Sequence, residues 1–310
     1  MNGFQKIIKY CAVAFAVFLC VVIFGSIAAA VFSVAVGVEG VSKSFDTRER
    51  ISFSEQYSAE KIEKQGIDSI YVDCDAEVVV ERGTMLSIEA DNVTKDYAIS
   101  CTNGVLSLVQ DRPKVFFHLA FWDNDITSQE RVVVTIPAEF HPERVTINSG
   151  SGKVFINELD TEKLLIDSGS GKVSAENVVS RDTELYTGSG SVRIDNSSLG
   201  RLMLDSGSGA VSMKNVVAED VRFDSGSGAI SVSGSLTGRC EFESGSGSVS
   251  LSVNGKEENY RIEADCGSGS FRVNGKKREE GIYGNNVEGE LIFDTGSGSV
   301  NVEFLTSAEE

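Results

Sequence analysis

Asp294 has the clearest catalytic context in this chain, because it stands in the string FDTGSGSV at residues 293–300. An Asp-Thr-Gly loop of this kind supplies a carboxylate in pepsin-type proteases, where two such aspartates share one proton. That chemistry needs one matching loop that faces Asp294. The sequence instead holds seven similar strings, and their regular spacing indicates a repeated structural unit.

The Gly-Ser-Gly unit occurs eight times, with NSGSGKV, DSGSGKV and YTGSGSV as the first three copies. The residues that precede the eight units are Ser149, Ser168, Thr187, Ser206, Ser225, Ser244, Cys266 and Thr295, at spacings of 19, 19, 19, 19, 19, 22 and 29. A tight turn repeated at a fixed period is typical of a stacked array in which each unit packs on its neighbour.

Apolar and polar residues alternate on both sides of each unit. Around Ser206, the apolar positions are Leu202 and Leu204 before the unit, and Val211 and Met213 after it. This period of two predicts a strand, a glycine corner and a second strand, with the Ser/Thr/Cys position on the buried side. One 19-residue unit buries too little apolar surface to offset its own backbone entropy. The sequence therefore predicts an all-β fold, a parallel β-solenoid (β-helix) of 19-residue Ser-Gly-Ser-Gly coils.

The position before each Ser/Thr/Cys residue is mostly acidic and has outward parity. Its occupants are Asn148, Asp167, Tyr186, Asp205, Asp224, Glu243, Asp265 and Asp294. Stacking predicts a ladder of carboxylates about 4.8 Å apart along one edge, which argues against the protease. We expect solvent and nearby hydroxyls to screen the repulsion, and no catalytic residue or cofactor is assigned.

The acid ladder is also the one candidate metal site. Its members Asp205, Asp224, Glu243, Asp265 and Asp294 are expected to follow one another in the stack and could bind Ca²⁺, which prefers carboxylate and carbonyl oxygens. A polysaccharide-active enzyme on a β-helix is a second use of the same acids, as general acid and base. No acid pair stands out as catalytic.

The cysteines indicate neither a zinc site nor a redox motif. Cys74, Cys101, Cys240 and Cys266 form no C-x-x-C pair, and the chain has only two histidines. Cys240 and Cys266 fall in inward columns, four residues apart in register, so we predict two buried thiols without a disulfide. Pairing of Cys74 with Cys101 stays open.

Residues 10–38 contain no charged side chain and begin YCAVAFAVFLCVVIFG. As one helix they would be about 43 Å long, more than the roughly 30 Å hydrocarbon core of a bilayer requires. We predict a transmembrane helix, with a cleavable secretion signal as the alternative. Lys6 and Lys9 favour a cytoplasmic N-terminus, although Lys43 and Arg48 follow the segment. The formal net charge of −18 excludes nucleic acid as a partner.

The expected organisation follows from these patterns. It comprises a cytoplasmic N-terminus at 1–9, the transmembrane helix at 10–38, a juxtamembrane stalk or cap at 39–66 with a short helix at 58–66, degenerate coils at 67–148, the regular solenoid at 149–305 and a tail at 306–310. In the degenerate coils, Ile70, Val72 and Cys74 take the inward positions. The apolar insertion at 114–122 is expected to form a packed cap or flap, with a sugar- or partner-binding platform as the alternative.

The order of these segments resembles a known family. The strings IDSIYVDCDAEVVVERG, MLSIEAD, GVLSLVQD and VVVTIPAEFHPERVTINSGSGKVFI, followed by the Ser-Gly repeats, are similar to the bacterial family of β-strand-repeat domains named "putative adhesin", a domain of unknown function. The resemblance covers about residues 60–305. It implies a β-solenoid outside the membrane and supplies no catalytic residues.

The combined prediction is a single-pass protein of the bacterial cell membrane, with its solenoid extracytoplasmic. It would act as a non-enzymatic cell-envelope scaffold or an adhesin-like binding module. Its partners would be the lipid bilayer, through the N-terminal helix, and an unknown envelope protein or glycan. The alternatives are the polysaccharide-active enzyme and a purely structural spacer.

Overall fold

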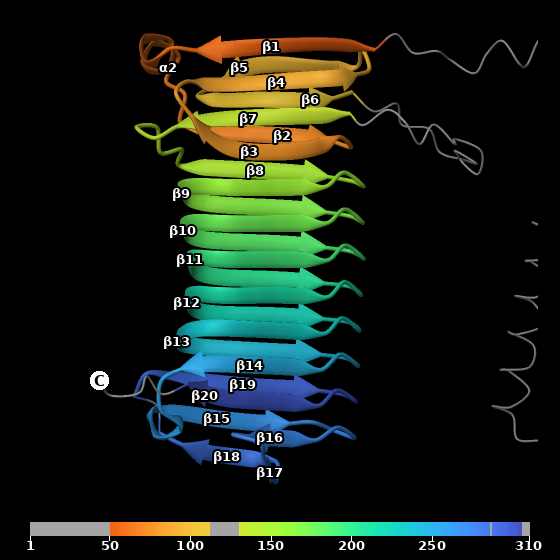
Figure 1. Cartoon of the computed structure of the whole chain (residues 1–310), viewed down its shortest axis with the longest axis vertical. Helices are drawn as coiled ribbons and strands as arrows, with labels where there is room; N and C mark the ends of the chain where they lie inside the picture. The colour runs from red at the N-terminus through yellow and green to blue at the C-terminus, as the bar shows by residue number, and fades with distance from the viewer. Residues whose placement is uncertain (1–49, 112–129, 286, 306–310) are drawn as a thin grey trace, which may run out of the picture. The chain divides into compact units, whose positions relative to one another are not determined.

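Successive 19-residue repeats pair in parallel along most of their length, as the periodicity predicts, with local register shifts at 198–202 and 213–222. In the computed structural model, Thr187 has Ser168 as its register partner on one side and Ser206 on the other. The structure describes residues 50–111, 130–285 and 287–305. Within these residues the parallel β-solenoid is confirmed (Figure 1).

Several predicted segments lie outside the described residues. These are the cytoplasmic N-terminus at 1–9, the membrane segment at 10–38, residues 39–49 of the stalk, the insertion at 114–122 and the tail at 306–310. No helix in the described part of the chain is long and apolar enough to cross a bilayer.

The elements fall into three groups along the chain. The N-terminal group is β1 Ile51–Tyr57, α2 Ala59–Gln65, β2 Ser69–Cys74, β3 Glu77–Gly83, β4 Leu86–Val93, β5 Tyr97–Thr102, β6 Val105–Gln110 and β7 Arg131–Pro137. The repeat group is β8 Arg144–Ser149, β9 Val154–Ser168, β10 Val173–Thr187, β11 Val192–Ser206, β12 Val211–Ser225 and β13 Ile230–Ser244. The C-terminal group is β14 Val249–Asn254, η1 Glu257–Asn259, β15 Tyr260–Asp265, β16 Phe271–Val273, β17 Lys276–Arg278, β18 Gly281–Gly284, β19 Gly289–Thr295 and β20 Val300–Leu305.

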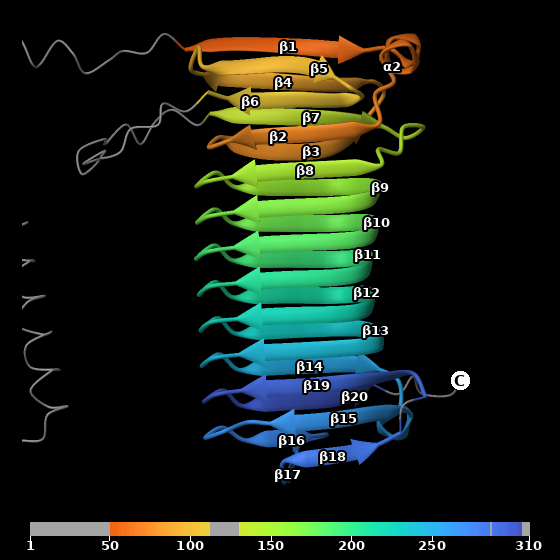
Figure 2. The ribbon, with the colours of Figure 1, turned by 180° about the vertical axis from the view of Figure 1, so that it is seen from behind.

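The solenoid has two faces joined at two corners. Face 1 is the set of strands that end at the Ser/Thr/Cys column, and face 2 is the set that begins after the glycine corner. Each strand from β9 to β13 contributes its first half to face 2 and its second half to face 1. The bend between the halves recurs at one column, where Asn177, Asn196 and Asn215 have φ angles of 56°, 52° and 52°. Asparagine tolerates this left-handed backbone better than most residues. Both views show the glycine corners aligned along the opposite edge (Figures 1 and 2).

The stack does not follow chain order at its two ends. Along face 1 the order is β5, β6, β2, β8, β9, β10, β11, β12, β13, β19, β15 and β18. The coil made by β19 and β20 therefore lies between the coil of β13 and β14 and the coil of β15 and β16. At the other end, β2 lies between β6 and β8 in the same way. The expectation that the last repeats stack consecutively was wrong.

Side-chain contacts explain the interchange at the C-terminal end, where the coil of β19 and β20 stacks before the coil of β15 and β16. Phe293 on β19 stacks on Phe242 of β13, with ring centroids 5.4 Å apart and planes 19° apart, and Phe242 stacks in turn on Phe223. Chain order would place Ala264 of β15 next to Phe242 instead. The interchange thus extends a row of aromatic rings, each of which prefers a ring as its neighbour.

Antiparallel strands close both ends. The turn from β5 to β6 is Asn103-Gly104, and the turn from β16 to β17 is Asn274-Gly275, with positive φ at all four residues. Two-residue Asn-Gly turns of this kind are the preferred connection of tight hairpins. The edge strand β17 consists of three exposed basic residues, which discourages pairing with another sheet edge.

The N-terminal region confirms part of the expected order. The predicted short helix is α2, which begins after the capping Ser58 side chain and ends at Gly66 with φ 61°. Ile70, Val72 and Cys74 are buried in register with Val145, Ile147 and Ser149 of the first regular strand. Residues 51–57, expected in the stalk, form β1, which pairs antiparallel with β4.

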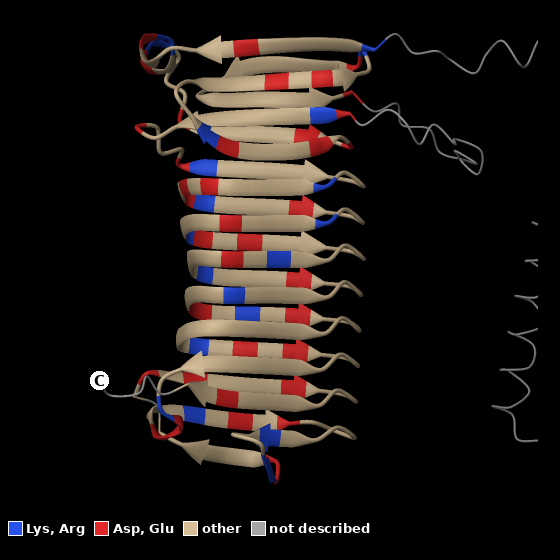
Figure 3. Ribbon diagram, viewed as in Figure 1, with Lys and Arg blue, Asp and Glu red and all other residues tan. Residues whose placement is uncertain are grey.

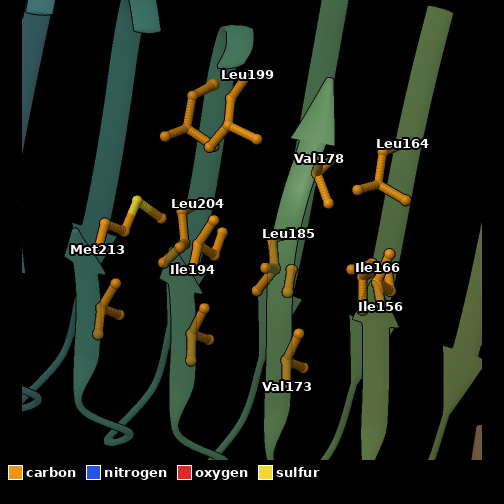
Figure 4. Packing of buried hydrophobic residues seen from close by; sticks show 14 of the residues in the cluster. Ile156, Leu164, Ile166, Val173, Val178, Leu185, Ile194, Leu199, Leu204 and Met213 are labelled. Carbon is orange, nitrogen blue, oxygen red and sulfur yellow. The ribbon is translucent and has the colours of Figure 1, made fainter. Parts of the chain in front are cut away.

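The core fills the space between the two faces. Buried residues of successive coils stand in rows, as Figure 4 shows for Ile166, Leu185 and Leu204 of face 1 and for Ile156, Ile194 and Met213 of face 2. One apolar cluster runs from Tyr57 to Val302. Each added coil extends this cluster, so the coils stabilise one another through their neighbours.

Candidate functional site

The Ser/Thr column at the glycine corner is buried, as its parity predicts. Each of its hydroxyl groups donates to the carbonyl oxygen of the glycine three residues later. The bonds join Ser149 to Gly152 (2.9 Å), Ser168 to Gly171 (3.2 Å), Thr187 to Gly190 (3.2 Å), Ser206 to Gly209 (3.1 Å), Ser225 to Gly228 (3.1 Å), Ser244 to Gly247 (3.0 Å) and Thr295 to Gly298 (2.8 Å). These hydroxyls are therefore engaged in closing the corner and are poorly placed to act as nucleophiles.

The second glycine of each corner approaches the coil below it. A Cβ atom at Gly209 would lie 1.8 Å from the carbonyl oxygen of Gly190. The close approach lets the corners themselves form a ladder, in which Gly207 N donates to Thr187 O and Ser208 N donates to Gly188 O, both at 2.9 Å. Glycine is required here by backbone proximity.

The acid ladder exists, but its order differs from the expected one. Asp205, Asp224 and Glu243 follow one another in register, and Asp294 then lies between Glu243 and Asp265. The acids before the glycine corners are the red blocks near the arrowheads in Figure 3. This geometry places Asp294 in a row of single acids, without the facing second loop that a pepsin-type site requires.

The ladder acids have some local partners. Arg222 Nη2 lies 3.6 Å from Glu243 Oε1, and Asp265 Oδ1 accepts a hydrogen bond from Gly267 N at 3.3 Å. Within the described ranges, no group of three or more His, Cys, Asp or Glu side chains could hold a metal ion. Ca²⁺ binding by the ladder remains an untested prediction.

A second charged column, which the sequence reasoning missed, runs along the other end of the face 1 strands. In stack order the column alternates in sign: Lys163, Asp182, Arg201, the acidic pair Glu219-Asp220, Arg239, Glu290 and Arg261. Arg201 is in register with Glu219, and a register shift follows at Asp220, whose Oδ1 accepts a hydrogen bond from Arg239 N at 3.0 Å. Arg201 Nε donates to Asp182 Oδ1 at 2.6 Å, and this bond lowers the pKa of the Asp182 carboxyl. The 19-residue spacing of these charges was a detectable signal.

Glu290 is the most enclosed member of this column, with 9% of its surface exposed. Its carboxylate accepts a hydrogen bond from Arg239 Nη1 of β13 at 2.9 Å and pairs with Arg261 of β15. Chain order would have placed the two arginines next to each other. Glu290 thus favours the insertion of β19 between β13 and β15.

Cys240 and Cys266 are buried thiols, as predicted. Burial raises the pKa of Cys240 to about 11, and burial also raises the pKa of Cys266. A thiol with a raised pKa is a weak nucleophile at neutral pH. In the described part of the chain, Cys74 and Cys101 are not joined by a disulfide.

A pocket of about 650 Å³ lies at the C-terminal end of the solenoid. Its lining comes from η1 and its flanks, β15, the Asn-Gly turn, β18 and β20: Lys256, Glu257, Glu258, Tyr260, Ile262, Asn274, Tyr283, Gly284 and Phe304. The rings of Tyr260 and Phe304 are 5.3 Å apart and tilted by 43°. Tyr260 is nearly fully buried, its hydroxyl donates to Leu236 O at 3.0 Å, and burial raises its pKa.

Some polar groups of the pocket are held by hydrogen bonds within the protein, and others can bind a ligand. Glu257 accepts hydrogen bonds from Asn274 Nδ2 and Arg278 Nη2, each at 2.9 Å, and Asn274 Oδ1 accepts from Phe304 N at 2.9 Å. Lys256 and Glu258 are exposed, and their side chains form no hydrogen bond or ion pair with any described residue. These two charges are the groups of the pocket that a ligand could engage.

Comparison with known proteins gives one family match. The model of the family described as Toastrack DUF4097 matches residues 67–303. No curated protein matches the chain. Three of the similar solved structures are as follows. A "putative adhesin" from Parabacteroides distasonis is 11% identical, with 84% of this chain and 98% of that chain covered and a TM-score of 0.42. A "putative lipid binding protein" from the same organism is 16% identical, with 85% and 96% covered and a TM-score of 0.41. A "putative cell adhesion protein" from Clostridium sporogenes is 12% identical, with 83% and 100% covered and a TM-score of 0.34.

Proposed function

Since the chain belongs to the Toastrack DUF4097 family, a family of repeated β-strands whose function is unknown, we propose a role from the geometry itself. The protein is a non-enzymatic binding module of the bacterial cell envelope, anchored in the membrane by residues 10–38 with its solenoid outside the cytoplasm. The uncharged run of 29 residues, preceded by Lys6 and Lys9, supports the anchor and its direction.

The observation that carries the proposal is the use of the repeat's hydroxyl groups. Seven Ser/Thr side chains, each in its own corner, donate to a carbonyl of that corner. The repeat therefore builds a stiff rod in place of a reactive surface. The twelve strands of face 1 in the described residues give a rod about 53 Å long at roughly 4.8 Å per strand.

The rod also separates two ends of different character. The chain enters the described unit at β1, an edge strand at one end, and the 650 Å³ pocket lies at the other end. An anchor that precedes β1 is thus joined to the end opposite the pocket. This arrangement supports a module that presents a binding end at a distance from its attachment.

Protease treatment of intact cells tests this proposal. With a C-terminal epitope tag, external protease should remove the tag signal from intact cells, while a cytoplasmic marker stays protected. Permeabilised cells supply the control for protease access to both proteins. A tag that stays protected until the cells are permeabilised would contradict the extracytoplasmic solenoid.

A further inference from the structure

We propose that the pocket at the C-terminal end binds one neutral sugar ring of a glycan. This inference extends the proposed function by naming a ligand class, and it rests on that function only for placing the pocket outside the cytoplasm. Binding itself is a property of the purified protein.

The apolar lining suits the C–H face of a pyranose. Tyr283 from the edge strand β18 and Phe304 from β20 are partly exposed and supply the apolar surface. Tyr260 and Ile262 from β15 are each 1% exposed, and Tyr260 packs against Phe304 and supports it. Ligand pockets typically measure about 300–1,000 Å³ and combine aromatic walls with a few convergent polar groups. A volume of about 650 Å³ gives room for one or two sugar rings.

The available charges favour a neutral ligand. Lys256, which precedes the short helix η1, offers N–H donors, and Glu258 within η1 offers acceptor oxygens. Their charges are opposite, so the pair provides no net attraction for a phosphate or an ammonium ion. Sugar hydroxyls both donate and accept, and can therefore use both groups at once.

The pocket is built before any ligand arrives. Glu257 is held by Arg278 and Asn274, and the Tyr283 hydroxyl donates to Glu279 O at 2.6 Å, which fixes the outer ring. Gly284 has φ 73°, and a Cβ there would lie 2.1 Å from Tyr260 O, so the backbone of β18 packs closely against β15. Groups that are already ordered reduce the entropic cost of binding.

The test uses the full-length chain in nanodiscs, which avoids glycoside detergents. Saturation-transfer NMR with methyl glycosides of neutral hexoses and N-acetylhexosamines identifies a binding sugar, and calorimetry then measures its Kd. The double variant Lys256→Gln/Glu258→Gln alters two exposed, unpaired side chains and should preserve the fold. We expect the Kd to rise at least about tenfold, which corresponds to about 1.4 kcal/mol.

The matched control is Lys277→Gln/Glu219→Gln, which removes the same two charges from two exposed residues that do not line the pocket. Its Kd should stay within about twofold of the wild type. Failure of all neutral glycosides to bind, or an equal loss in both double variants, would overturn the proposal. These outcomes are independent of cell-surface protection, so they distinguish a wrong ligand class from a wrong location.

Discussion

A methyl group added at Gly209 would lie 1.8 Å from the carbonyl oxygen of Gly190, whereas real Cβ contacts essentially never fall below 3.0 Å. In Gly209→Ala, the two coils must therefore separate locally by about 1.2 Å. The hydrogen bonds from Gly207 N and Ser208 N, both 2.9 Å long, would stretch to about 4.1 Å and be lost.

The expected cost follows from these two bonds. Each lost bond costs about 1 kcal/mol net, and up to about 3 kcal/mol where the group stays buried without a partner. Alanine recovers about 0.4–1 kcal/mol by restricting the unfolded chain. We expect a net loss of about 2–4 kcal/mol, or a fall of about 10 °C in Tm for a unit of this size.

Thermal and urea unfolding followed by circular dichroism measure this loss. Ser208→Ala is the matched control, since it changes the neighbouring exposed residue and adds no atom to the corner. Its Tm should stay within about 2 °C of the wild type. If Gly209→Ala unfolds at the wild-type temperature or above it, the close-approach account of the corner is wrong.

Three further substitutions test other parts of the structure. Ser206→Ala removes the 3.1 Å hydrogen bond to Gly209 O and should lower the free energy of unfolding in urea by about 1–2 kcal/mol. Ser206→Thr keeps a hydroxyl group and should lower it less. Equal losses in the two variants would contradict the role of the bond. Glu290→Gln removes the charge shared by two arginines and should cost about 1–3 kcal/mol. A cost no larger than that of Glu219→Gln, at an exposed residue, would contradict its role in holding β19. The folded pKa of Cys240 is raised from 9.0 to about 11, so the stability that its neutral thiol contributes is present below pH 9 and lost between pH 9 and 11. Relative to Cys240→Val, the free energy of unfolding of the wild type should fall by about 2–3 kcal/mol over this range. Parallel plots of unfolding free energy against pH for the two proteins would refute the raised pKa.

The regular part of the fold was predictable because the sequence repeat determines how its strands pair. A strict 19-residue period and a two-residue alternation specify both the register and the buried side of each strand. Ser149 and Thr295 are buried as expected for that reason. The acids of the ladder point outward by the same parity.

The coil order at the ends was not predictable from spacing alone. The connections before β15 and β19 are long enough to allow either order, so the choice depends on which side chains match across layers. The matching of Phe242 with Phe293, and of Arg239 with Glu290, is recognisable in the sequence only once both orders are compared.

The pocket was beyond sequence reasoning for a different physical reason. Its lining comes largely from the two irregular insertions after β14 and β16, which have no period from which to infer parity. Tyr260 lies beside Phe304 although 44 positions separate them in the chain. Their proximity depends on the interchange of the last coils.

That interchange is the central claim, since it forms the pocket, and crosslinking tests it directly. Ser244 and Thr295 are buried register partners on neighbouring parallel strands, about 4.8 Å apart, within the Cα range of a disulfide. In Ser244→Cys/Thr295→Cys/Cys266→Ser, mild oxidation should join positions 244 and 295, as shown by mass spectrometry of non-reduced peptides. In Ser244→Cys alone, the native Cys266 lies two strands away from position 244 in the stack, about 9.6 Å. No disulfide between these two cysteines should form. A disulfide between position 244 and the native Cys266 in that single variant would instead show consecutive stacking and contradict the account.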